Sequence, residues 1–137
     1  MAYLEKQEKS GMSMDRERFE WLVVKVVESL PDEFSNKLEN IDVVVEDQPT
    51  SSQLAEVGLK RGETLLGLYE GVPLTKRSRH YGMVTPDKIT IFQKPIEARC
   101  KNDTEVKAEI LRVVQHEIAH HFGIGDGRLR QLAKGKN

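Results

Sequence analysis

Apolar residues recur along the chain with two different spacings. Between residues 14 and 30 they fall at every third or fourth position, which is typical of one buried helical face. Residues 41–45 are a short β-branched run, and residues 65–72 carry leucines between glycines, so both segments are predicted to be strands. Residues 88–93 alternate apolar and polar side chains, which indicates the second arm of a hairpin that begins near Met83.

Capping residues mark where the predicted helices begin and end. Ser13 is expected to cap the first helix, and Ser51 or Ser52 a short second one. Asn102, with a glutamate three residues later, is a capping-box signature that opens a long helix to about Phe122. The order of elements is helix, strand, helix, three strands and two helices. It predicts an α+β domain with one small sheet.

Length and composition limit the possible classes of protein. The chain has 137 residues, enough for one domain, and we expect residues 1–12 to form a flexible tail and residues 13–137 a single domain. A net charge of −1 argues against a nucleic-acid-binding role. The sequence shows neither a signal peptide nor an apolar run long enough to span a membrane, so we expect a cytoplasmic protein. The single cysteine, Cys100, cannot form an internal disulfide and is expected to be a buried thiol.

Three of the four histidines fall within six residues, in the order His116, His120 and His121. His116 to His120 form an H-E-x-x-H motif on the long predicted helix. Residues four apart project from one helical face, so His116 and His120 can bind one Zn²⁺ ion. Glu117 can then act as the general base that takes a proton from water at the metal. His121 points elsewhere on the helical wheel, and we expect it on the core face.

A catalytic zinc site needs a third protein ligand, and Asp126 is our candidate. Gly123 can adopt the left-handed conformation that ends a helix, which lets the chain turn back toward the metal. Asp126 also has a purely structural interpretation as the cap of a last helix over residues 127–133. Asp103, Glu97 or a carboxylate from a partner are the alternative ligands.

The extended motif HEIAHHFGIGD resembles the zinc-binding sequence of zincin metallopeptidases, with Asp126 where metzincins carry a third histidine. The ordered segments IDVVVEDQP, LLGLYEGVPLTKRS, YGMVTPDKITIFQKPI and VVQHEIAHHFGIGD are similar to the small bacterial zincin-like family of minimal metallopeptidases. This resemblance covers about residues 15–132. It implies a compact α+β domain with a mixed sheet, a zinc-binding helix and protease activity.

The segment after the motif differs from that of larger zincins. Eleven residues come after Asp126, and none is the methionine that supports the metal in metzincins. We expect a shallow cleft, so that either the activity is low or a partner or a second copy of the chain completes the cleft. A peptide substrate is expected to pair with an edge strand, either residues 89–93 or residues 66–70.

The remaining polar candidates lie in a basic loop. Tyr81 is the best donor for charge that develops on the carbonyl oxygen of a substrate, while residues 76–80 have the alternative interpretation of a solvated loop. Trp21 and Tyr69 are expected in the core. The sequence therefore predicts a Zn²⁺-dependent hydrolase acting on a peptide or protein substrate. The alternative is a metal-stabilised protein-binding module with little or no proteolytic activity.

Overall fold

A computed structural model of the chain describes residues 2–6, 12–59, 63–71 and 87–123. The helices are α1 (Arg16–Glu28), α2 (Asp32–Ser35), the 3-10 helix η1 (Asn36–Leu38), α3 (Ser51–Val57), α5 (Gln93–Glu97) and α6 (Asp103–Phe122). The strands are β1 (Ala2–Lys6), β2 (Ile41–Glu46), β3 (Glu63–Glu70) and β4 (Asp87–Phe92). None of these helices combines the length and the apolar character needed to cross a membrane.

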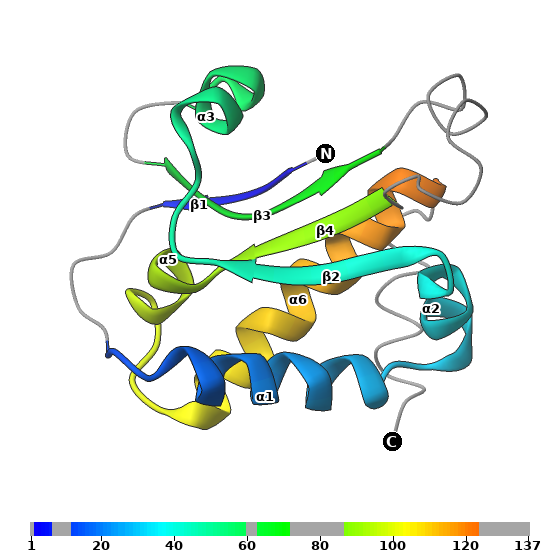
Figure 1. The fold of residues 1–137 in the computed structure, drawn as a ribbon, viewed down its shortest axis with the longest axis horizontal. Coiled ribbons are helices and arrows are strands. Elements are labelled where there is room, and N and C mark those ends of the chain that lie inside the picture. The colour runs from blue at the N-terminus through cyan, green and yellow to red at the C-terminus, as the bar shows by residue number, and fades with distance from the viewer. Residues whose placement is uncertain (1, 7–11, 60–62, 72–86, 124–137) are drawn as a thin grey trace.

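The four described strands form one mixed sheet in the order β1-β3-β4-β2 (Figure 1). β3 is antiparallel to both β1 and β4, whereas β2 is parallel to β4. The predicted α+β fold with a small mixed sheet is confirmed. Neither strand that the sequence offered as an edge lies at an edge of this sheet. β3 and β4 are interior strands, and the edges are β1 and β2.

The N-terminal segment differs from its prediction. Residues 1–12 were expected to be a flexible tail, but Ala2–Lys6 form strand β1. An edge strand is held by main-chain hydrogen bonds to a neighbouring strand, and these bonds require no apolar side-chain pattern. The partner, β3, lies about sixty residues later in the sequence, so local composition carries no sign of the pairing.

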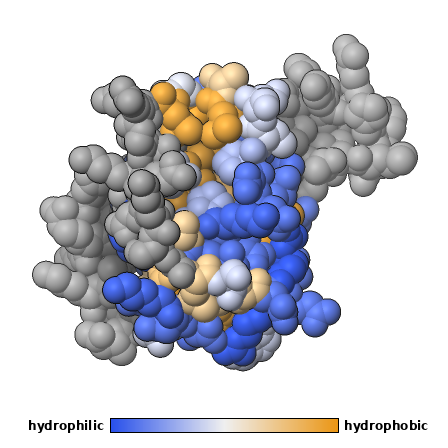
Figure 2. Space-filling model, turned by 90° about the vertical axis from the view of Figure 1, so that its left-hand side faces the viewer, coloured by the Kyte–Doolittle hydropathy of each residue, from blue (hydrophilic) through white to orange (hydrophobic). Residues whose placement is uncertain are grey.

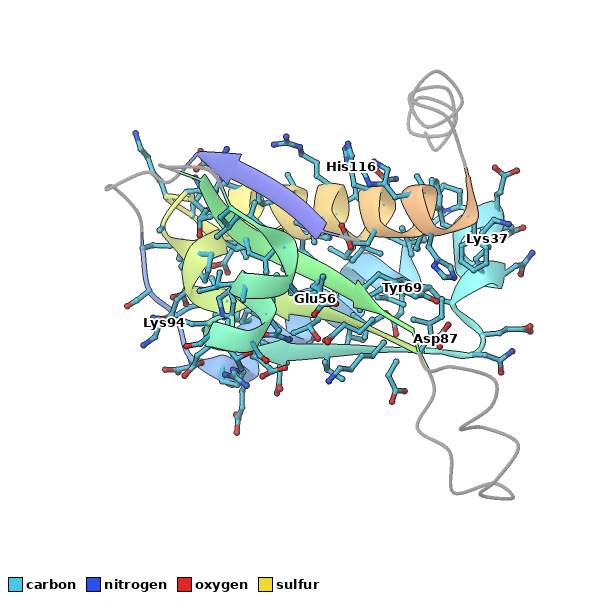
Figure 3. All side chains as sticks on the ribbon, turned by 90° about the horizontal axis from the view of Figure 1, so that it is seen from above. Lys37, Glu56, Tyr69, Asp87, Lys94 and His116 are labelled. Carbon is cyan, nitrogen blue, oxygen red and sulfur yellow. The ribbon has the colours of Figure 1, made fainter. Side chains whose placement is uncertain are left out.

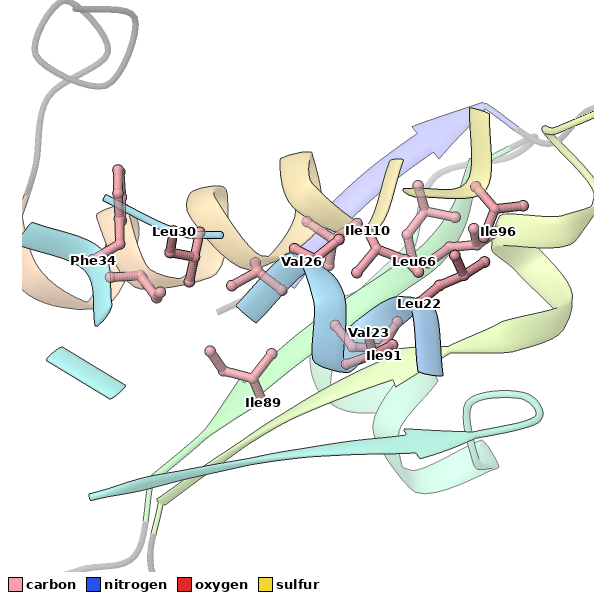
Figure 4. Close-up of a cluster of buried hydrophobic side chains, with 14 of the residues drawn as sticks. Leu22, Val23, Val26, Leu30, Phe34, Leu66, Ile89, Ile91, Ile96 and Ile110 are labelled. Carbon is pink, nitrogen blue, oxygen red and sulfur yellow. The ribbon is translucent and has the colours of Figure 1, made fainter. Parts of the chain in front are cut away.

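The main core lies between the sheet and the pair of helices α1 and α6 (Figure 4). Its fully buried side chains include Phe19 and Val26 of α1, Ile89 and Ile91 of β4, and Ile110 of α6. A second cluster lies on the opposite face of the sheet, where Leu65, Leu68 and Phe92 pack against Leu54 and Val57 of α3. In Figure 2 the apolar surface gathers at the upper end, where Figure 1 places α3.

The helix boundaries agree only partly with the predicted caps. The cap of α1 is Asp15 rather than Ser13, and the Asp15 side chain makes no capping hydrogen bond. The cap of α3 is Thr50, which forms a reciprocal capping box with Gln53, so the prediction of a serine cap at 51 or 52 is wrong. Asn102 caps α6 as predicted and accepts the main-chain N–H of Glu105 at 2.9 Å. These differences are shifts of one or two residues and leave the helices where they were expected.

Two core predictions have opposite outcomes. Cys100 is buried as expected. Trp21, in contrast, is 47% exposed on the outer face of α1. The guanidinium of Arg18 lies 4.6 Å from the centre of its ring, with the ammonium of Lys25 at 5.3 Å. The indole is thus covered by cations along its own helix instead of by the core.

A glycine sets the distance between α6 and β3. A Cβ atom added at Gly67 would lie 2.3 Å from Cγ1 of Val113 and 3.2 Å from the carbonyl oxygen of Thr90. Real Cβ atoms do not approach other heavy atoms as closely as the first of these distances. The absence of a side chain at Gly67 therefore lets the middle of β3 lie directly on α6.

This contact predicts that Gly67→Ala lowers the free energy of unfolding by about 1–3 kcal/mol, the usual cost of overpacking a filled core. Urea unfolding followed by circular dichroism measures the change. Gly71→Ala is the matched control, because a Cβ there would lie 3.7 Å from its nearest neighbour, Asp87 Oδ1. Combining Gly67→Ala with Val113→Ala should relieve the clash. Equal stability of Gly67→Ala and Gly71→Ala would contradict the close contact.

Candidate metal centre

The last turns of α6 bring the two motif histidines together. His116 and His120 lie one turn apart, with ring centroids separated by 6.0 Å and ring planes at 89° (Figure 3). His120 is exposed and His116 is half-buried, so both rings lie at the surface of the helix. At this spacing both imidazoles can reach one ion with the bonds of about 2.0–2.1 Å that zinc forms to nitrogen.

The ring of His116 is oriented by its own helix. Its Nδ1 lies 2.9 Å from the main-chain oxygen of Arg112, one turn earlier. A carbonyl oxygen only accepts hydrogen bonds, so Nδ1 carries the hydrogen and Nε2 carries the lone pair. A histidine that binds a metal through one nitrogen normally donates the other to an acceptor of this kind. This contact suits metal binding through Nε2 of His116.

The motif glutamate lies beneath the two histidines rather than beside them at the surface. The Glu117 side chain is fully buried. Its Oε1 accepts the main-chain N–H of Tyr69 on β3 at 2.8 Å. Its Oε2 is buried and has no hydrogen-bond partner among the described residues.

This environment changes the acidity of Glu117. Burial disfavours the charged carboxylate and raises the pKa of Glu117 to about 8, although the hydrogen bond from the Tyr69 main chain opposes the increase. A buried polar atom without a partner is costly, and a nearby cation would offset much of that cost. Two imidazole nitrogens that can reach one ion are ligands that suit zinc. The residues present fit a bound zinc ion on these grounds.

The third ligand is not found in the part of the chain that the structure describes. There, no group of three histidine, cysteine, aspartate or glutamate side chains is arranged to hold a metal. Asp103 opens α6 about 20 Å along the helix axis from His116 and pairs with Arg18. Glu97 accepts hydrogen bonds from the main-chain N–H of Met14 and from Gln93 Nε2. Both alternatives are thus engaged elsewhere, and Asp126 and Tyr81 lie outside the described residues.

His121 does not have the position predicted for it. It was expected on the core face of α6, but it is exposed. Its ring stacks on that of Tyr69, with centroids 3.9 Å apart and planes at 15°. The Tyr69 hydroxyl in turn donates to Oδ2 of Asp87 at 2.7 Å. His121 lies in the last turn of α6, where residues 120–123 are all exposed, so its ring is at the surface although it contacts β3.

Tyr69 is the residue of this site that the sequence did not reveal. It was expected in the core, and its side chain is indeed buried. Its contribution to the site comes from its main-chain N–H, which holds Glu117. Every residue except proline carries that group, so no sequence pattern could have identified it.

The raised pKa makes stability depend on pH. With the metal removed by a chelator, native Glu117 keeps its proton up to about pH 8, whereas the unfolded chain loses it near the ordinary value of 4.5. The unfolded state therefore binds fewer protons across this range, and stability falls as pH rises, by about 1 kcal/mol per pH unit. We expect urea unfolding of metal-free Glu117→Gln to lack this dependence. An unchanged slope would show that Glu117 is not the titrating group.

Comparison with known proteins agrees with the zincin resemblance. Residues 38–136 match the family described as zincin-like metallopeptidase. The fold is similar to that of a conserved hypothetical protein from T. thermophilus, with a TM-score of 0.50 and 23% identity over 83% of this chain and 99% of that one. No curated protein matches the chain. Because the family match spans more than half of its length, the chain belongs to the zincin-like metallopeptidase family.

Proposed function

We propose that the chain is a zinc-dependent peptidase that hydrolyses peptide bonds with water. Family membership supports metallopeptidase chemistry in general. The observation that carries the specific proposal is the position of Glu117. Its side chain is anchored through Oε1 to β3, and Oε2 has no hydrogen-bond partner among the described residues. On the same helix, the imidazoles of His116 and His120 can share one ion.

Three residues are proposed as metal ligands. His116 and His120 contribute imidazole nitrogens from α6, and Asp126 contributes a carboxylate after the turn at Gly123. That glycine ends α6 with a φ of 72°, a left-handed conformation that favours glycine and redirects the chain. When bound, zinc supplies Lewis-acid chemistry that acidifies water and polarises a carbonyl group.

Glu117 is proposed as the general base and acid. The Tyr69 N–H fixes Oε1, which leaves Oε2 to take a proton from the attacking water and to pass it to the departing amine. Burial favours the protonated form of Glu117, so this side chain can hold the proton between the two steps. Tyr81 is proposed to donate a hydrogen bond to the carbonyl oxygen as negative charge develops there.

One observation favours a second function. Glu117 is fully buried, and a buried carboxylate bonded to the main chain can also serve as a purely structural tie between α6 and β3. The second candidate is therefore a metal-stabilised module that binds proteins without cleaving them. Substitution of Glu117 and of the proposed ligands distinguishes the two functions.

Glu117→Gln should keep zinc and lose hydrolysis. Glutamine preserves the acceptor for Tyr69 N–H but cannot take a proton, and removal of a general base costs about 10²–10⁴-fold in rate. Inductively coupled plasma mass spectrometry measures the zinc content. Cleavage of a casein-derived peptide library measures the hydrolysis.

The matched control is Glu105→Gln. This glutamate lies on the same helix but is exposed in its first turn. It should retain full activity. Undiminished hydrolysis by Glu117→Gln would exclude Glu117 as the base. A wild-type protein that holds zinc and captures proteins without cleaving them would favour the binding module.

Asp126→Asn should weaken zinc binding by more than about 100-fold, since loss of a direct ligand costs at least as much as loss of the groups that orient one. Competition with a fluorescent zinc chelator measures the affinity. Asp103→Asn is the control, because Asp103 pairs with Arg18 at the far end of α6. Equal zinc affinity of the two variants would show that Asp126 is not the third ligand.

A further inference from the structure

The outer edge of β3 is covered by a strand from the beginning of the chain. β1 pairs antiparallel with β3, from Ala2 opposite Leu68 to Lys6 opposite Glu63. It also contacts α6. Figure 3 shows β1 crossing over the first half of α6, the helix on which His116 is labelled. The strand therefore lies next to the helix that carries the candidate metal ligands.

Glu117 continues the line of β1 along this edge. In an antiparallel ladder the N–H and C=O of one residue point toward the same neighbouring strand. The N–H of Tyr69 donates to Glu117 Oε1 rather than to β4, so it points toward the side of β3 on which β1 pairs. Ala2 of β1 lies opposite Leu68, and the Glu117 carboxyl group bonds to the residue of β3 that follows, Tyr69. A peptide strand paired with β3 along this edge would lead to the Glu117 carboxylate.

The pairing of β1 with β3 is short and irregular. The register shifts between Tyr3 and Leu4, which lie opposite Gly67 and Leu65. The shift leaves Leu66 of β3 without a residue opposite it, and a bulge of this kind interrupts the hydrogen-bonded ladder. The ladder between β1 and β3 is therefore interrupted within the five residues of β1.

The first helix does not depend on β1 for its position. The N–H of Met12 donates to the main-chain oxygen of Glu97 at 3.1 Å. The N–H of Met14 donates to Glu97 Oε2 at 2.9 Å, and the carbonyl of Met14 accepts from Gln93 Nε2 at 2.9 Å. These bonds fix the chain to α5 just before α1. Release of β1 from the sheet would leave these bonds intact.

The sequence already leads us to expect that a peptide substrate pairs with an edge strand, and residues 66–70 of β3 are one of the two candidates. We propose that β1 is an internal occupant of this edge beside Glu117 and that an extended peptide must displace β1 to bind there. Recognition is mainly through the main chain, so the partner is an extended segment free of proline at its paired positions. A strand joined by a short segment competes at an effective concentration on the order of millimolar. The proposed function decides what happens to the bound peptide, whereas binding itself does not require hydrolysis.

A reversible crosslink tests this proposal in the full chain. Glu5 and Thr64 are opposite each other in the ladder, at a spacing that a disulfide can bridge. The variant Glu5→Cys with Thr64→Cys would lock β1 in place when oxidised. The probe is a fluorescein-labelled peptide with the Ala2–Lys6 sequence. By fluorescence anisotropy we expect the oxidised protein to bind it at least about tenfold more weakly than the same protein after reduction.

The controls separate the crosslink from other effects of oxidation. Each single cysteine variant should bind the peptide equally well when oxidised and reduced. Cys100 is buried and does not compete for the crosslink. Equal affinity of the oxidised and reduced double variant would overturn the proposal, whatever its hydrolytic activity. The expected change in affinity with no hydrolysis by wild-type protein would refute the proposed peptidase alone.

A second variant releases the strand instead of locking it. Tyr3→Pro with Leu4→Pro removes two successive main-chain N–H groups, and since these point to opposite sides, one of them faces β3. This variant should bind the labelled peptide at least about tenfold more tightly than wild type. Ser10→Pro, between β1 and Met12, is the control and should bind as wild type does. Unchanged affinity of the double proline variant would also overturn the proposal.

Discussion

The hydrogen bond from the Tyr69 main chain to Glu117 ties α6, the helix that carries the candidate metal ligands, to the sheet, and the candidate site depends on it. The Tyr69 nitrogen on β3 lies 2.8 Å from Glu117 Oε1 on α6. Two residues earlier on β3, Gly67 allows the strand to approach Val113 of α6. Because Glu117 is held beneath the helix surface, its neighbours His116 and His120 are directed outward. The same contact thus fixes the carboxylate and leaves both imidazoles accessible to a metal.

Burial of Glu117 joins stability to chemistry. A carboxyl group surrounded by the core resists ionisation, which raises its pKa to about 8 and makes the metal-free fold less stable as pH rises. In the proposed role of Glu117, the same burial favours the protonated form that exists between taking a proton and returning it. A glutamine of the same size at position 117 would not titrate. The buried glutamate therefore costs stability that glutamine would not cost.

The order of strands determines how a peptide can reach this carboxylate. β4 is buried between β2 and β3, and β3 is covered by β1 for most of its length. The sequence suggested β3 or β4 as a free edge because each has the pattern of a strand near the motif. It could not show that Ala2–Lys6 covers β3, since strand pairing is decided by contacts between distant segments. The position next to Glu117 is consequently one for which the chain's own strand and an extended peptide compete.

The sequence by itself determined the features that depend on neighbouring residues. These include the long helix from its Asn102 cap to the turn at Gly123, the side of that helix shared by His116 and His120, and the mixed α+β composition. Helix caps and helical faces follow from spacings of three or four residues, which are visible in any sequence. Only the tertiary structure decided that Glu117 is buried against β3, that His121 is exposed and that β1 joins the sheet. Those features depend on main-chain hydrogen bonds and close contacts between residues far apart in the chain, and such contacts leave no local pattern.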